Sequence, residues 1–185
     1  MSFARKPAKP RAPLTQPELY DHAVRALGRR MRTQAELTRL LAARAEPGPA
    51  GAEAVNAVLA RLRAHGYLND TAYAETFARL RQENDKFGAR RVRQDLRQKG
   101  IAAPLVEQTL AERYASTDEA ALARQHLERK RIGKPTNPKD SARVMRRLLT
   151  AGFSTGTIYK VLRQWNVPDE DLAALDNLES EPPAE

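Results

Sequence analysis

The sequence predicts an all-α protein of three tandem three-helix repeats, stacked into an elongated, curved array. Apolar residues recur at helical spacing along most of the 185 residues, and aromatic residues make up only 5% of them, which favours helices with small cores over a sheet sandwich. The apolar pattern also repeats. One run with the spacing i, i+3, i+4, i+7 consists of Val55, Val58, Leu59 and Leu62. The same spacing returns 103 positions later in Ile158, Val161, Leu162 and Trp165.

A longer match relates the middle of the chain to its last third at a constant offset of 52. The earlier positions are Val92, Leu96, Gly100, Ile101, Val106 and Leu110. Their counterparts are Val144, Leu148, Gly152, Phe153, Ile158 and Leu162. Agreement at so many positions, including a glycine followed by an apolar residue, exceeds what chance gives. It predicts units that each bury a small core and complete it by stacking on a neighbour.

These patterns place the three repeats at residues 17–67, 68–115 and 116–167. Residues 1–16 are basic and rich in proline, and they are expected to form a disordered tail because they cannot bury enough apolar surface. Residues 168–185 contain acidic but no basic side chains, and we expect a second disordered, solvated tail there.

Capping residues indicate where helices of the first repeat begin and end. Thr33 and Glu36 form a T-x-x-E capping box, which predicts the start of the second helix. Gly66 is expected to end the third helix, because glycine adopts the left-handed conformation without steric cost. Asn69 or Asp70 can then cap the next helix.

The second repeat begins with an apolar stripe of Tyr73, Phe77 and Leu80 at the spacing i, i+4, i+7. Gly88 breaks this run. A second stripe then follows in Ala89, Val92 and Leu96, and Gly100 is expected to close that helix.

In the third repeat, Thr117 and Asp118 are expected to start the first helix, and Pro138 lies near the start of the second.

Charge and composition indicate the class of partner. A formal net charge of +9 and a pI near 10.2 favour a polyanionic partner, although an arginine-rich solvated surface would give the same totals. There are no cysteines, which fits a reducing compartment and excludes thiolate metal sites. No apolar run approaches the roughly 18 residues of a membrane span. The sequence therefore predicts a cytoplasmic protein without membrane contact.

No arrangement of residues predicts catalysis. His22, His65 and His126 fall in different repeats without a partner at metal-ligand spacing, so all three are interpreted as surface or boundary residues. The sequence predicts neither an enzyme nor a bound metal or cofactor.

Basic residues cluster by helix face and predict a surface that binds phosphates or acidic side chains. Arg90, Arg93 and Arg97 project within a narrow arc beside the apolar stripe. The full predicted surface comprises Arg90, Arg91, Arg93, Arg97, Lys99, Arg129, Lys130, Arg131, Lys134, Arg143, Arg146 and Arg147. For Lys99 and Arg131, a favourable interaction with a helix C-terminus is a sufficient alternative explanation.

Several motifs resemble those of the RecX family. They are the GYLND string that begins at Gly66 and the pattern G-x-R-R-V-x-x-x-L-x-x-K-G-I from Gly88 to Ile101. Upstream, Arg30 and Arg32 precede Thr33 and Glu36–Leu37 as in the family's R-x-R-S-x-x-E-L segment, with threonine in the serine position. The resemblance covers roughly residues 20–165. It departs from the family at residues 46–51, where a Pro/Gly-rich insertion replaces a lysine–glycine turn.

The resemblance implies a partner that composition could not name. RecX proteins bind filaments of the RecA recombinase, lie along the filament groove, and modulate ATP hydrolysis, strand exchange and filament growth. We therefore expect a monomer that inhibits RecA and binds single- or double-stranded DNA weakly and non-specifically through the basic surface.

Two other classes of protein remain open on the sequence. A helix-turn-helix transcription regulator would bind one DNA sequence through a single recognition helix. A generic helical scaffold for protein binding would show no salt-dependent affinity for DNA.

Overall fold

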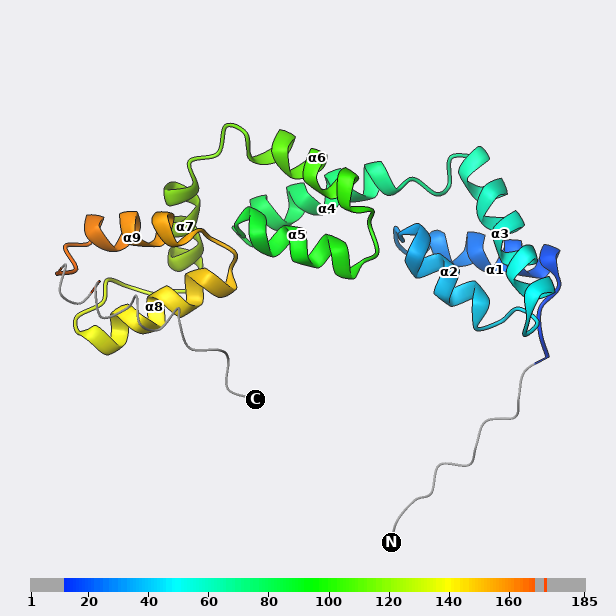
Figure 1. Cartoon of the computed structure of the whole chain (residues 1–185), viewed down its shortest axis with the longest axis horizontal. Helices are drawn as coiled ribbons and strands as arrows, with labels where there is room; N and C mark the ends of the chain where they lie inside the picture. Colours follow the sequence, from blue (N-terminus) through cyan, green and yellow to red (C-terminus); the bar gives the residue numbers. More distant parts are fainter. Residues whose placement is uncertain (1–11, 169–171, 173–185) are drawn as a thin grey trace, which may run out of the picture. The chain divides into compact units, whose positions relative to one another are not determined.

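The computed structural model describes residues 12–168 and 172, and within this part of the chain it contains nine helices and no strand. The helices are α1 (Gln16–Leu27), α2 (Gln34–Ala42), α3 (Pro49–Ala64), α4 (Asp70–Glu83), α5 (Ala89–Gln98), α6 (Ala103–Tyr114), α7 (Glu119–Arg129), α8 (Pro138–Thr150) and α9 (Thr155–Gln164) (Figure 1). The predicted all-α class is confirmed. Most of the two predicted tails, residues 1–11, 169–171 and 173–185, lies outside the described residues.

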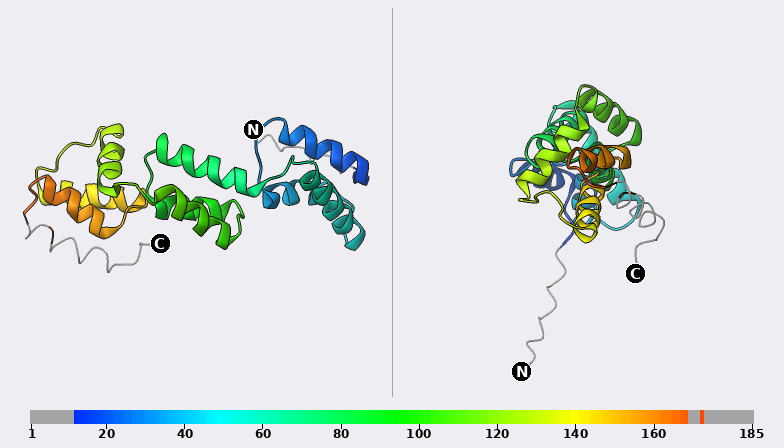
Figure 2. Two further views of the ribbon diagram at one scale, coloured as in Figure 1. Left: turned by 90° about the horizontal axis from the view of Figure 1, so that it is seen from above. Right: turned by 90° about the vertical axis from the view of Figure 1, so that its left-hand side faces the viewer.

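The described residues form two compact units. The first comprises residues 12–73 with the short segment 99–101, and the second comprises residues 74–98 and 102–168 with residue 172. In the first unit, α1, α2 and α3 all pack against one another (Figure 2). In the second, α5 packs on α6, and α9 packs on both α7 and α8. The limits of the three repeats and their elongated stacking stay predictions.

Side-chain caps begin the helices close to the predicted residues. Asn69, not Asp70, caps α4, since its side-chain oxygen accepts the Ala72 N–H at 2.9 Å. Asp118 caps α7 by accepting two backbone N–H groups, as does Asn137 for Asp140 N–H at the start of α8. These bonds satisfy donors that have no partner inside a helix.

Only half of the predicted capping box at α2 forms. The Thr33 hydroxyl accepts the Glu36 N–H at 3.1 Å and donates to the Lys99 carbonyl at 2.7 Å. The Glu36 carboxylate pairs with the Lys99 ammonium at 2.9 Å instead of returning to the helix start. Burial opposes ionisation of Glu36, but the hydrogen bond and charge of Lys99, with Arg30 and Arg32 nearby, outweigh it and lower the pKa of this carboxyl.

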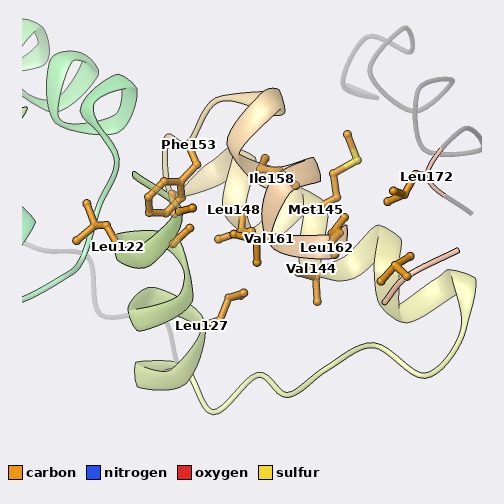
Figure 3. Close-up of a cluster of buried hydrophobic side chains, with 14 residues drawn as sticks. Leu122, Leu127, Val144, Met145, Leu148, Phe153, Ile158, Val161, Leu162 and Leu172 are labelled. Atoms are coloured by element: carbon orange, nitrogen blue, oxygen red, sulfur yellow. The ribbon is translucent and has the colours of Figure 1, made fainter. Parts of the chain in front are cut away.

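The larger hydrophobic cluster fills the space between α7, α8 and α9 (Figure 3). Phe153, between α8 and α9, is fully buried there. Leu148, Ile158 and Leu162 contribute equally buried side chains, which accounts for the apolar spacing of these helices in the sequence. Trp165 packs against the edge of the cluster.

Two interpretations of individual residues were wrong. Leu80 is 42% exposed, because the alanines Ala74 and Ala78 form the buried face of α4 in its place. His126 is not a surface residue, since it is only 2% exposed, and it lies where α7 contacts the loop after α4. Its Nδ1 lies 3.0 Å from the Asp85 carbonyl oxygen, and its ring lies 5.7 Å from that of Phe87.

The pKa of His126 is shifted by this environment. Burial, assisted by the charges of Lys130 and Arg147, lowers the pKa, although the hydrogen bond to the Asp85 carbonyl opposes the shift. His126 is therefore a neutral core residue of the second unit at neutral pH.

A close backbone approach joins the start of α5 to the end of α8. The Gly88 N–H donates to the Ala151 carbonyl at 2.9 Å, and the Arg90 N–H donates to the Gly152 carbonyl at 3.3 Å. A Cβ on Gly88 would lie 2.3 Å from the Gly152 carbonyl oxygen. Gly152 itself has φ +88°, and a Cβ there would lie 2.2 Å from the Arg91 nitrogen. Both positions therefore require glycine.

None of the helices in residues 12–168 is long and apolar enough to cross a membrane.

Candidate functional site

The basic face of α5 forms as predicted but is partly neutralised. Arg90, Arg93 and Arg97 line one open depression of about 420 Å³, together with Gln94 and Gln98. This places the three arginines on the same side of the helix.

Glu107 of α6 pairs with two members of this triplet. It accepts from Arg93 Nε at 3.0 Å and from Arg97 at 2.9 Å. The hydrogen bond from Arg93 is the main cause of a lowered pKa at Glu107, and Arg97 adds to it. An ionised carboxylate therefore occupies this face at neutral pH, and only Arg90 has no carboxylate partner among the described residues.

Two of the predicted site residues on this segment have internal partners. Arg91 donates from Nε to Asp95 at 3.0 Å, four residues along α5, and its guanidinium also approaches the Thr150 carbonyl at 3.5 Å. Lys99 pairs with Glu36, whose side chain is only 12% exposed. Both cations therefore contribute to packing within their own unit.

A second group of cations surrounds a depression of about 550 Å³ between α8 and the loop after α7. Its basic lining residues are Arg131, Arg143, Arg146 and Arg147, joined by Ile132, Gly133 and Thr150. We call it the α8 depression. No acidic side chain lines it, and within the described residues the one carboxylate paired with these arginines is Asp140, 3.2 Å from Arg143.

Backbone geometry brings Arg131 to the α8 depression. Arg131 has φ +56°, and the Ile132 N–H donates to the Leu127 carbonyl at 2.9 Å, so the chain turns back sharply at the end of α7. The sequence placed Arg131 in a run with Arg129, Lys130 and Lys134. These three are exposed but do not line the depression.

The two basic faces belong to the same unit and meet at the Gly88–Gly152 approach. Thr150 lines the α8 depression, and its carbonyl is the one that Arg91 of α5 contacts. The predicted basic surface thus includes an α5 face on which Arg90 alone has no carboxylate partner, and an α8 depression in which only Arg143 pairs with a carboxylate of the described residues.

The described residues contain no group of three or more His, Asp or Glu side chains that could hold a metal ion. Their carboxylates are mostly engaged by arginine or by helix caps.

Comparisons with known proteins agree on one family. A model of the second three-helix domain of RecX matches residues 69–110. The regulatory protein RecX of Escherichia coli O9:H4 (strain HS) is 34% identical over 172 residues, covering 89% of this chain and 97% of the relative. The regulatory protein RecX of Leptothrix cholodnii is 35% identical over 149 residues, covering 80% of this chain and 89% of the relative.

Solved structures show the same fold. A crystal structure of a regulatory protein RecX superposes with a TM-score of 0.65 at 27% identity and covers 80% of this chain and 71% of that one. The structure of RecX from Lactobacillus salivarius superposes with a TM-score of 0.66 at 20% identity, covering 82% of this chain and 96% of that one. These structures consist of three-helix repeats.

Proposed function

Because the chain belongs to the RecX family of regulatory proteins, whose members are non-enzymatic regulators of RecA in recombination and repair, we propose that it binds RecA nucleoprotein filaments and inhibits them. Inhibition would reduce ATP hydrolysis, strand exchange and filament growth. The protein acts in the cytoplasm, where RecA filaments assemble, and binds them as a monomer.

The observation that carries this proposal is the α8 depression. Arg131, Arg146 and Arg147 lie around one concave surface, and no described carboxylate pairs with them. Guanidinium groups bind phosphate or carboxylate oxygens through paired hydrogen bonds, which makes such a surface suited to DNA phosphates or to acidic side chains of RecA.

The α5 face contributes a second, weaker contact. An incoming anion must compete with Glu107 for Arg93 and Arg97. Arg90, by contrast, is exposed and has no carboxylate partner among the described residues. Several weak contacts on one chain give a combined affinity well above that of each contact alone. Contacts to phosphates position a protein without reading bases, so DNA binding is expected to be modest and independent of sequence.

The test measures the DNA-dependent ATPase of RecA while the protein is titrated in. The double variant Arg146→Ala/Arg147→Ala should shift the midpoint of inhibition by at least about tenfold, because each missing hydrogen bond to a charged group is worth roughly 1.5–3 kcal/mol. DNA binding can be measured by fluorescence anisotropy over a series of salt concentrations. The slope of the logarithm of affinity against the logarithm of salt concentration should become shallower by about 0.9 for each phosphate that the variant no longer binds.

A matched control keeps the charge change constant. Arg25→Ala/Arg29→Ala removes two exposed arginines of α1 and the loop after it, and should inhibit RecA like the parent protein. Val92→Asp should also lose inhibition, but because it unfolds: the substitution places an unpaired charge at a fully buried position. If the α8 double variant keeps the parent's melting curve and inhibits RecA with the parent's midpoint, the α8 depression is not the contact surface.

A further inference from the structure

Four side chains of the first unit form a connected aromatic and basic cluster. The Arg61 guanidinium lies 4.3 Å from the centroid of the Tyr20 ring, and the Tyr20 hydroxyl lies 3.0 Å from Nδ1 of His65. The His65 ring lies 6.2 Å from the rings of both Tyr20 and Tyr67, in edge-to-face arrangements. We call these residues the Tyr67 cluster. None of them was assigned to a site by the sequence.

Tyr67 is 58% exposed, more than any other large apolar side chain in the described part of the chain. Its backbone is nevertheless fixed. Gly66 has φ +72° and ends α3, the Tyr67 N–H donates to the Leu62 carbonyl at 2.9 Å, and the following Leu68 is buried. The fold therefore holds this ring in solvent from an ordered helix end, without using it in the core.

The charged member of the cluster is a cation without a carboxylate partner. Arg61, in the last turn of α3, is exposed and forms no ion pair with a carboxylate of the described residues. Arg63 is also exposed and unpaired there, but two residues further along the helix it projects from a different face. The Arg61 guanidinium is stacked on Tyr20, so its plane is oriented and the hydrogen-bond donors at its rim stay available. Aromatic rings beside an unpaired guanidinium group suit a ligand that is both planar and anionic.

We infer that the Tyr67 cluster is a binding site for unpaired nucleotides of single-stranded nucleic acid. The base stacks on the Tyr67 ring, which the edge-to-face contact with His65 helps to hold, and a neighbouring phosphate contacts Arg61. Base stacking on an aromatic side chain tolerates any sequence, because every base has a π face. In a duplex the bases are stacked on one another, so this site favours single strands over double strands.

This site is separate from the α8 depression, and its test contains no RecA, so either proposal can fail without the other. Fluorescence anisotropy compares a labelled oligothymidylate with an oligonucleotide of the same length whose bases are replaced by abasic residues. Both probes carry the same phosphates. The parent protein should bind the base-containing strand at least roughly fivefold more tightly, since stacking on one aromatic residue contributes about 1–3 kcal/mol.

Tyr67→Ala should abolish this preference while leaving the affinity for the abasic strand and the salt dependence unchanged. Tyr67→Phe should retain the preference, because the ring and not the hydroxyl stacks. Met31→Ala removes another exposed apolar side chain, 50% exposed in the same unit, and should bind like the parent. Thermal melting monitored by circular dichroism checks that the variants are folded.

Three results would overturn the inference. One is equal affinity of the parent for the base-containing and abasic strands, and another is a base preference that survives in Tyr67→Ala. The third is a ratio of single-strand to duplex affinity that Tyr67→Ala leaves unchanged, because removing the stacking ring should weaken only the single strand.

Discussion

Replacing Gly88 by alanine should destabilise the second unit. The substitution adds a single methyl group, and φ at Gly88 is not in the left-handed region, so backbone conformation does not oppose it. The opposition is steric. The added Cβ would lie 2.3 Å from the Gly152 carbonyl oxygen, 2.6 Å from its carbon and 2.9 Å from the Phe153 nitrogen. All three are backbone atoms, which cannot move aside as a flexible side chain can.

The loss of stability caused by the steric contact can be separated from backbone effects by comparing Gly88→Ala with substitutions at three other glycines. Overpacking a close contact costs about 1–3 kcal/mol, which is the loss expected for Gly88→Ala. Gly66→Ala isolates the backbone effect, since φ is +72° but no atom lies within 4 Å of the added Cβ, and it should cost about 1–2 kcal/mol. Gly152→Ala combines both effects and should cost the most. Gly156→Ala, in α9 with open space around it, should stabilise by about 0.5–1 kcal/mol.

Trp165 provides a local probe for this measurement. It is the sole tryptophan of the chain and packs against the α7–α9 core, so its fluorescence reports unfolding of the second unit. Urea titrations followed by tryptophan fluorescence should show a lower midpoint for Gly88→Ala. Gly66→Ala lies in the first unit and should change circular dichroism at 222 nm before it changes the fluorescence.

The reasoning is refuted if Gly88→Ala unfolds at the parent's urea concentration with an unchanged slope. The methyl group would then fit without displacing the Gly152 carbonyl, and the approach of α5 to α8 would not require glycine.

Three other predictions concern pH and shape. The folded pKa of Glu36 is lowered below the ordinary 4.5, so its pairing with Lys99 stabilises the fold above that pH, and this stabilisation is lost as pH falls. In urea titrations, the difference in unfolding free energy between the parent and Glu36→Gln should therefore shrink on acidification. The folded pKa of His126 is lowered below 6.5, so the unfolded chain binds more protons below that pH. The second unit should then lose stability as pH falls through 6.5 toward the lowered value, a slope that His126→Gln removes. We predict that the repeats stack into an elongated array, so the radius of gyration in small-angle scattering should be clearly above the roughly 16 Å of a compact globule of this length.

Helix identity could be predicted from this sequence because apolar spacing and caps are local signals. The residues at the repeated apolar positions, such as Val92, Leu96 and Val144, are buried, except for Trp165, which is partly buried. A threonine at one core position also has a local explanation, because the Thr109 hydroxyl donates to the Leu105 carbonyl at 2.8 Å and so satisfies its polar atom within α6.

The composition of the basic surface could not be predicted, because it depends on contacts between distant segments. Nothing within α5 shows that Glu107 of α6 neutralises Arg93 and Arg97. The pairing of Lys99 with Glu36 links residues 63 positions apart. The place of Arg131 depends on a positive φ at a non-glycine residue, which the sequence does not mark.

The glycine repeat shows how a pattern can be visible in the sequence while its cause is not. Gly100 and Gly152 recur at an offset of 52 and both have positive φ, as expected for glycines after a helix. The structure adds a second constraint. A Cβ on Gly100 would lie 2.3 Å from the Ala35 Cβ at the start of α2, just as one on Gly152 would meet Arg91 at the start of α5.

The hydrogen bonds at these two contacts correspond as well. The residue before Gly100 accepts a bond through its carbonyl from the Thr33 hydroxyl, and the residue before Gly152 accepts one from the Gly88 N–H. A side chain at one contact thus performs the role of a backbone group at the other. Because Thr33 and Gly88 share no chemistry, sequence comparison alone could not align them. Yet both hold the end of one helix against the start of another, so the same packing requirement explains the glycine at both positions, Gly100 and Gly152.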